Sequence, residues 1–226
     1  SLFLFNLYSM KKEVSLVLSS GGARGIAHIG VIEELLSRDY KIRSISGTSM
    51  GALVGGIYAA GGLQLYKEWM LTLDRMDVFN LVDFTFSLSG IVKGDKVLQE
   101  MKKIIPDRKI EDLSIPFVAI ATDILHEREY VFKEGNLYEA IRASVSIPSV
   151  FKPFEYQGLK LVDGAVINPM PINRVNRAEN DLLVAVDVNA KIPYIHKIKS
   201  PKIQLKSEFK QDNNYEKYKR LLSSKI

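Results

Sequence analysis

The stretch that decides the fold spans residues 42–60 and reads IRSISGTSMGALVGGIYAA. Residues 42–46 form a short run containing two isoleucines, which predicts a buried strand that Gly47 interrupts. Residues 52–60 return to an apolar segment rich in small residues, which predicts a helix ended by Gly61-Gly62. A strand that leads through a glycine-flanked turn into a helix is the basic unit of an α/β sheet.

The residues before this stretch repeat the same order of elements. Residues 14–18 are aliphatic and predict a strand buried on both faces, which stops at Ser19-Ser20-Gly21-Gly22. Residues 26–37 then carry apolar side chains at helical spacing. Two successive strand–helix units indicate a parallel sheet with right-handed crossovers. We therefore predict an α/β fold, a three-layer α/β/α architecture with a mainly parallel central sheet.

The remaining elements follow from the same patterns. Gln157-Gly158 separates two short strand-like runs and predicts a hairpin. Residues 79–94 are irregular and partly apolar, typical of either a mobile lid or an ordinary core segment. The other predicted elements are helices at 63–76, 95–105 and 137–145, and strands at 116–122, 129–132, 154–156, 159–162 and 182–188, the last of them buried.

The length of 226 residues suits one α/β domain, which we place at residues 14–190. Residues 1–13 are interpreted as an N-terminal extension. Residues 191–226 are a basic C-terminal tail with a helix predicted over 214–223. The net charge is +5, and lysines are frequent beyond Lys191. This excess fits either a solvated surface or transient contact with an anionic membrane surface. No nucleic-acid partner is expected, because the basic residues are dispersed, and the oligomeric state is left open.

The sequence contains no cysteine, which excludes disulfides, thiolate metal sites and cysteine nucleophiles. The sequence contains no run of about 18 or more apolar residues, so no membrane-spanning helix is predicted. The apolar residues 1–8 are followed, not preceded, by lysines, which is the wrong order for a secretory signal. A cytoplasmic location is therefore expected.

Gly47-Thr48-Ser49-Met50-Gly51 matches the G-x-S-x-G nucleophile elbow and lies between a predicted strand and a predicted helix. Such a sharp turn holds the serine in a strained backbone conformation and exposes its hydroxyl at the positive end of the next helix. The alternative is a serine that merely caps a helix. The context favours Ser49 as a nucleophile.

A second glycine-rich turn, residues 20–25, also joins a strand to a helix. Free N–H groups at a helix start can bind an anion. A phosphate-binding loop would need G-x-G-x-x-G with a later acidic residue, or a G-K-[ST] ending, and neither is present. The two turns end successive strands of one parallel sheet, so both should face the same crevice. This favours an oxyanion hole facing the nucleophile.

Asp163-Gly164-Ala165 follows the predicted hairpin, and by itself this sequence is typical of a turn. A Ser49–Asp163–His196 triad has the chain order of α/β-hydrolases and remains an alternative. His28 is interpreted as a packed, hydrogen-bonded side chain and His126 as a loop residue.

Together these motifs resemble the patatin-like phospholipase family, most closely its short bacterial members. The resemblance covers roughly residues 14–190 and includes His28-Ile29-Gly30-Val31, Ile91-Val92-Lys93-Gly94-Asp95 and Ser146-Ile147-Pro148. It implies that Ser49 attacks an acyl ester and that Asp163 completes a Ser–Asp dyad without histidine. It also implies an oxyanion hole formed by Gly21, Gly22, Ala23, Arg24 and Gly25, with Gly47 and Gly51 as the elbow glycines. Ser20 stands where the family often carries a further glycine.

The implied substrate is a lipid or another acyl ester, and no metal or organic cofactor is required. Arg24 could read a phosphate head group or could serve the loop structurally. Three other functions stay open at this point. They are a general esterase or thioesterase, a catalytically silent lipid- or protein-binding member, and a nucleotide binder that the missing Lys-Ser/Thr pair disfavours.

Overall fold

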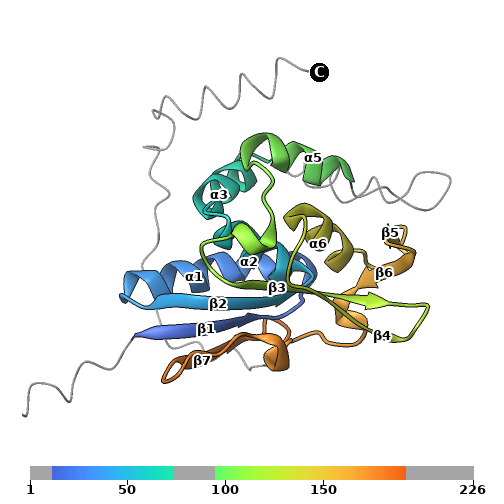
Figure 1. Cartoon of the computed structure of the whole chain (residues 1–226). Helices are drawn as coiled ribbons and strands as arrows, with labels where there is room; N and C mark the ends of the chain where they lie inside the picture. Colours follow the sequence, from blue (N-terminus) through green and yellow to red (C-terminus); the bar gives the residue numbers. More distant parts are fainter. Residues whose placement is uncertain (1–11, 74–94, 192–226) are drawn as a thin grey trace, which may run out of the picture. The chain divides into compact units, whose positions relative to one another are not determined.

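The computed structural model describes residues 12–73 and 95–191, although not the side chains of Asp95 and Lys96. The chain divides into two units, residues 1–190 and 191–226. Every described helix and strand belongs to the first unit (Figure 1). The expectations for the 79–94 segment and for the C-terminal helix lie outside the described residues.

A seven-stranded sheet forms the centre of this unit, in the order β5-β6-β3-β2-β1-β7, with β4 also paired to β3. The pairs β1–β2, β1–β7 and β2–β3 are parallel, whereas β4, β5 and β6 join through antiparallel pairs. The α/β class and the mainly parallel character of the central sheet are confirmed. The strands are β1 (Glu13–Leu18), β2 (Lys41–Thr48), β3 (Phe117–Asp123), β4 (Arg128–Phe132), β5 (Phe154–Tyr156), β6 (Leu159–Asp163) and β7 (Leu182–Val186).

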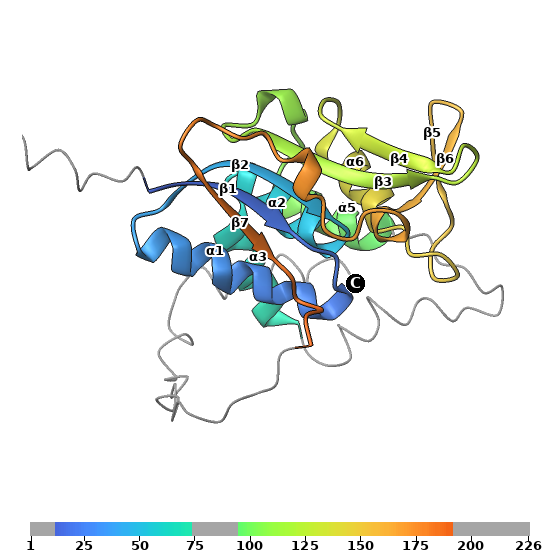
Figure 2. The same ribbon diagram turned by 90° about the horizontal axis from the view of Figure 1, so that it is seen from below.

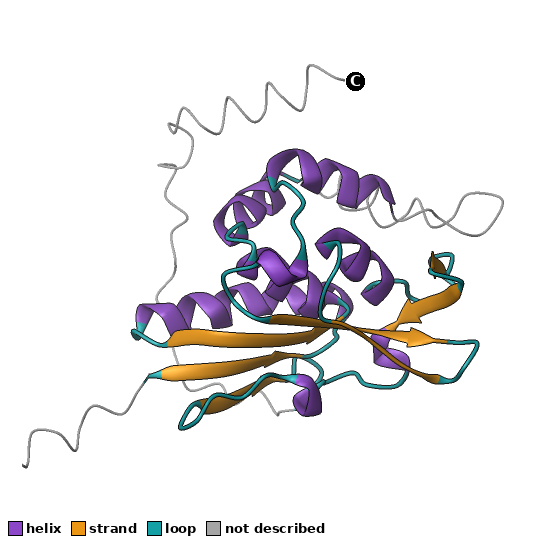
Figure 3. Ribbon diagram, viewed as in Figure 1, coloured by secondary structure: helices purple, strands orange, loops and turns teal. Residues whose placement is uncertain are grey.

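The α-helices of the described residues lie together on one face of the sheet (Figures 1 and 3). Val14, Leu16 and Leu18 of β1 alternate toward this face and join the core with Val54 and Ile57 of the central helix. The helices are α1 (Ala27–Ser37), α2 (Met50–Ala59), α3 (Leu63–Thr72), α5 (Asp95–Ile104) and α6 (Leu137–Ser144).

The opposite face of the sheet carries hydroxyl groups, and a chain segment without α-helix covers it. Ser46 Oγ donates to the carbonyl of Pro171 at 2.9 Å, and Thr48 Oγ1 donates to that of Asn168 at 2.8 Å. Two short 3-10 turns interrupt the segment, η5 (Gly164–Val166) and η6 (Ile172–Arg174). The view from below shows this segment running under β2 and β3 (Figure 2). In the described part of the chain, this segment therefore stands in the place of the second helical layer that the α/β/α prediction expects on that face.

Strand β7 differs from its expected burial. The sequence predicted a buried strand, yet Leu182 and Leu183 are 38% and 40% exposed. The reason is position, since among the described strands β7 lies at the edge of the sheet and pairs with β1 alone. Among the described residues, no helix is long and apolar enough to cross a membrane.

Candidate active site

Ser49 occupies a sharp turn between β2 and α2, as the elbow motif predicts. Strand β2 ends at Thr48, helix α2 begins at Met50, and Ser49 has φ 56° and ψ −121°. This left-handed φ is strained for a side chain other than glycine. A Cβ on Gly51 would lie 2.2 Å from the carbonyl oxygen of Leu18, and one on Gly47 would lie 2.5 Å from that of Gly51. The flanking glycines therefore allow the close approach that the turn requires.

Two strand ends bring Ser49 and Asp163 together. Parallel β2 pairs with the first half of β3 and ends with Thr48 opposite Ile120. Antiparallel β6 pairs with the last residues of β3 and ends with Asp163 opposite Ala121. Because β4 occupies the other edge of β3 at both positions, β2 and β6 must share one edge. Their carboxyl ends therefore meet head to head, and the residues at or just after those ends become neighbours.

The two side chains form a short, buried contact. Ser49 Oγ donates a hydrogen bond to Asp163 Oδ2 at 2.6 Å, and each residue is only 4% exposed. Asp163 Oδ1 accepts from the N–H of Ala165 at 2.8 Å. Burial raises the pKa of Asp163, while the hydrogen bonds from Ser49 and Ala165 oppose that rise. Asp163 is thus both the turn former that its sequence suggests and the partner of the serine hydroxyl.

Sequence reasoning missed a further contact at Ser49. The Ser49 N–H donates to Ser144 Oγ at 2.8 Å, and Ser144, the last residue of α6, is fully buried. A serine at a helix end is too common to reveal this role, and the contact joins positions far apart in the chain.

The glycine-rich turn lies against the nucleophile elbow. Residues Gly22–Ile26 form a 3-10 turn, η2, that precedes α1. A Cβ on Gly25 would lie 2.2 Å from Cγ of Met50, so the turn packs directly on the residue after Ser49. Gly21 accepts from the N–H of Arg24 at 3.2 Å. The N–H groups of Gly22 and Ala23 start the turn and have no intrahelical acceptor.

Residues beyond the turn hold it in place. The N–H of Ser20 donates to the carbonyl of Pro169 at 2.8 Å, and Asn189 Nδ2 donates to the carbonyl of Ser20 at 2.7 Å. His28 is fully buried and its Nε2 bonds the carbonyl of Ser19 at 2.8 Å, in agreement with the packed role expected for it. Burial lowers the pKa of His28, and the bond to Ser19 opposes that change.

The remaining histidine, arginine and tryptophan side chains that the sequence singled out make no hydrogen bond to the Ser49–Asp163 pair within the described residues. His126 Nδ1 lies 2.6 Å from Asp123 Oδ2 in the turn between β3 and β4. His196 is outside the described residues, so the triad alternative is not tested. Arg24 is exposed, and its side chain makes no hydrogen bond or ion pair within the described residues. Trp69 is buried in the core.

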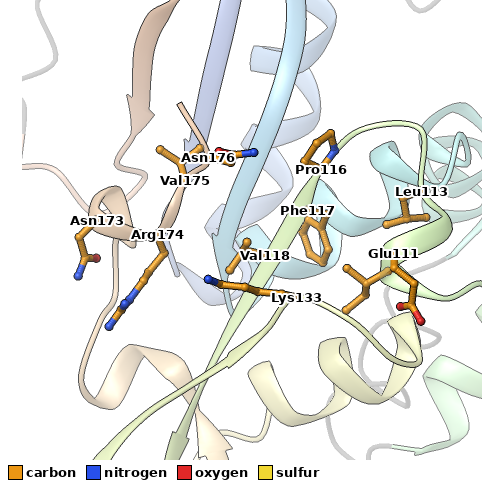
Figure 4. Close-up of a pocket in the computed structure, with 11 residues that line it drawn as sticks. Glu111, Leu113, Pro116, Phe117, Val118, Lys133, Asn173, Arg174, Val175 and Asn176 are labelled. Carbon is orange, nitrogen blue, oxygen red and sulfur yellow. The ribbon is translucent and has the colours of Figure 1, made fainter. Parts of the chain in front are cut away.

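A cavity of about 630 Å³ lies toward the amino end of β3 (Figure 4). Pro116, Phe117 and Val118 line it together with Lys133 and Arg174. Asp163 pairs further along the same strand, at Ala121, so this cavity is not the space around the Ser49–Asp163 pair. Within residues 12–73 and 95–191, no cluster of three or more potential ligands is placed to hold a metal ion.

Comparison with known proteins identifies the family of this chain. The family described as patatin-like phospholipase matches residues 16–175. An uncharacterized NTE family protein of Mycobacterium tuberculosis is 42% identical over 181 residues, covering 80% of this chain and 50% of that protein. Patatin-like phospholipase domain-containing protein 7 of Rattus norvegicus is 31% identical over 185 residues, covering 79% of this chain and 14% of that protein.

Among solved structures, VipD from Legionella pneumophila aligns with a TM-score of 0.48 and 16% identity, covering 77% of this chain and 49% of that one. The chain thus spans about half the length of its mycobacterial relative and a smaller share of the mammalian one. The family match covers most of the described sheet together with both glycine-flanked turns. The chain therefore belongs to the patatin-like phospholipase family.

Proposed function

We propose that this protein is a serine acyl-ester hydrolase acting on lipids, of the phospholipase A or lysophospholipase type, with Ser49 as nucleophile and Asp163 as its base. The observation that carries the proposal is the 2.6 Å hydrogen bond from Ser49 Oγ to Asp163 Oδ2 in a buried position. A carboxylate is a weak base toward a serine hydroxyl in water. The burial that raises the pKa of Asp163 makes it a stronger base.

In the first step, Asp163 accepts the Ser49 proton while Oγ forms a bond to the ester carbonyl carbon, whose oxygen becomes negative. Collapse of this intermediate breaks the bond to the leaving alkoxide, which takes the proton from Asp163. A water molecule then attacks the acyl-enzyme and gives its proton to Asp163. Release of the acid breaks the acyl–Oγ bond, and the proton returns to Ser49.

The oxyanion of each intermediate needs donors that are in place beforehand. The glycine-rich turn, residues 21–25, packs on Met50 beside the nucleophile. The N–H groups of Gly22 and Ala23 have no intrahelical acceptor, and we assign them as the oxyanion donors. One such donor is typically worth about 3 kcal/mol of transition-state stabilisation. Gly21, Arg24 and Gly25 shape the turn that presents these donors.

A lipid substrate is supported by the family and by the mammalian relatives, which are named patatin-like phospholipase domain-containing proteins. The exposed Arg24, beside the proposed oxyanion donors, suits a phosphate head group. The net charge of +5 would favour transient contact with an anionic membrane surface.

The proposal is tested by hydrolysis of p-nitrophenyl esters of increasing acyl length by the wild type and by Ser49→Ala. We expect turnover that rises with chain length and is lost in Ser49→Ala. Turnover without chain-length preference and without activation by micelles would instead indicate a general esterase or thioesterase. A folded wild type that hydrolyses none of the esters would overturn the proposal in favour of a silent binding member.

A further inference from the structure

Ser144 holds the main chain of the nucleophile. The N–H of Ser49, in its strained conformation, donates to Ser144 Oγ at 2.8 Å. Ser144 Oγ in turn donates its single proton to the carbonyl of Ile120 at 2.6 Å. That second bond fixes the hydroxyl so that a lone pair faces Ser49. Ile120 stands opposite Thr48 on β3, at the place where the ends of β2 and β6 meet.

The chain just after Ser144 also holds the main chain of Asp163. The N–H of Asp163 donates to the carbonyl of Ser146 at 2.9 Å. Ser146 is itself fixed, because its Oγ accepts from Arg142 Nη1 at 2.6 Å and donates to the Arg142 carbonyl at 2.7 Å. Ser144 and Ser146 are both fully buried, so water does not compete for these bonds.

Residues 144–146 thus contact the backbone of both proposed catalytic residues, although Ser49 and Asp163 are 114 positions apart in the chain. We infer that this segment is a positioning element for the reaction, in which Ser144 Oγ sets the orientation of Ser49 and the Ser146 carbonyl sets that of Asp163. The inference rests on the proposed function, since it concerns how the proposed nucleophile and base are aligned. A displacement of about 1 Å at a reacting group can cost about 100-fold in rate.

A matched pair of variants separates the effect of losing the Ser144 hydroxyl from the effect of changing the side-chain volume. Ser144→Thr keeps the hydroxyl and adds a methyl group, whereas Ser144→Val has nearly the same shape without a hydroxyl. We expect Ser144→Val to react roughly 10- to 100-fold more slowly than Ser144→Thr, through kcat and with little change in KM. The rate of covalent labelling of Ser49 by a fluorophosphonate, measured per folded molecule, should fall by the same factor.

Ser44→Ala is the control for loss of a buried serine. Ser44 is 2% exposed, lies on β2 and bonds Ser15 Oγ at 2.9 Å on the face away from the α-helices. We expect its melting temperature to fall while its labelling rate per folded molecule stays at the wild-type value. If Ser144→Val fails to fold, Ser144→Ala is compared with Ser44→Ala by the same two measurements.

The outcomes separate the inference from the proposed function. A wild type that the fluorophosphonate does not label at Ser49 would refute the proposed function. A labelled wild type with equal rates in Ser144→Thr and Ser144→Val, or with Ser144→Ala as reactive as Ser44→Ala, would overturn the positioning role alone.

Discussion

At the scale of single residues, the environment of Asp163 links activity to stability. Burial raises its pKa above the ordinary 3.8, so the folded protein binds more protons than the unfolded chain just above that pH. Its ionised form therefore lowers the stability at neutral pH. We expect Asp163→Asn to lose activity by about 10²- to 10⁴-fold while its melting temperature at neutral pH equals or exceeds that of the wild type.

The pH profile of the wild type tests the same residue. Because the base must be ionised, kcat/KM should fall on the acid side at a pH above that of an ordinary aspartate. Full ester turnover by Asp163→Asn would contradict the role of Asp163 as a base. A large fall in the melting temperature of the same variant would contradict the inference that ionised Asp163 lowers the stability of the fold.

His28 gives a second prediction at this scale, on stability. It is buried with Nδ1 lacking a hydrogen-bond partner among the described residues, and burial lowers its pKa below 6.5. Neutral His28 therefore contributes fully to the stability of the fold at a pH above the pKa of histidine in the unfolded chain. This contribution is lost as the pH falls below about 6.5, because the unfolded chain then binds the proton more readily than the folded protein. Urea unfolding at about pH 7.5 and about pH 5.5 should show a smaller pH dependence in His28→Gln than in the wild type. Equal pH dependence would rule His28 out as the cause.

At the scale of elements, two helical glycines should respond in opposite ways to the same change. Gly51→Ala places a Cβ 2.2 Å from the Leu18 carbonyl oxygen, so the elbow must shift, at a cost of about 1–3 kcal/mol. Gly30 lies inside α1, and apart from the backbone of α1 itself no atom of the described residues is within 4 Å of the added Cβ, so Gly30→Ala should stabilise by about 0.5–1 kcal/mol. Urea unfolding measures both. A Gly51→Ala variant as stable as the wild type would contradict the close packing of α2 on β1.

At the scale of the whole molecule, we propose residues 14–190 as the catalytic domain and residues 191–226 as a basic tail. All described strands, Ser49 and Asp163 lie before Lys191. A chain ending at Ala190 should therefore keep its turnover of soluble esters, measured against the full chain. It should also bind vesicles containing phosphatidylglycerol more weakly at low salt, because each lysine near an anionic surface contributes about 1 kcal/mol. Unfolding of the shortened chain would show that the tail belongs to the domain.

Local patterns predicted most elements to within a few residues. The elbow, the hairpin at Gln157-Gly158 and the helix that begins at Leu137 each depend on neighbours in the chain, through glycine, turn residues and apolar spacing. The prediction that β7 is buried was wrong for a different reason. Its sequence, Leu-Leu-Val-Ala-Val, is that of a strand covered on both faces, and a local pattern does not reveal which strand becomes the edge.

The sequence by itself determined the α/β class, through two successive strand–helix units, and the candidate nucleophile Ser49, through the glycines of its elbow motif. The family resemblance added Asp163 as the candidate base of Ser49. Only the tertiary structure decided how these two residues meet. Antiparallel β6 runs toward parallel β2 along one edge of β3, and the bonds from Ser144 and Ser146 reach both backbones. Strand order and long-range hydrogen bonds depend on the packing of the whole sheet, which leaves no local signal in the chain.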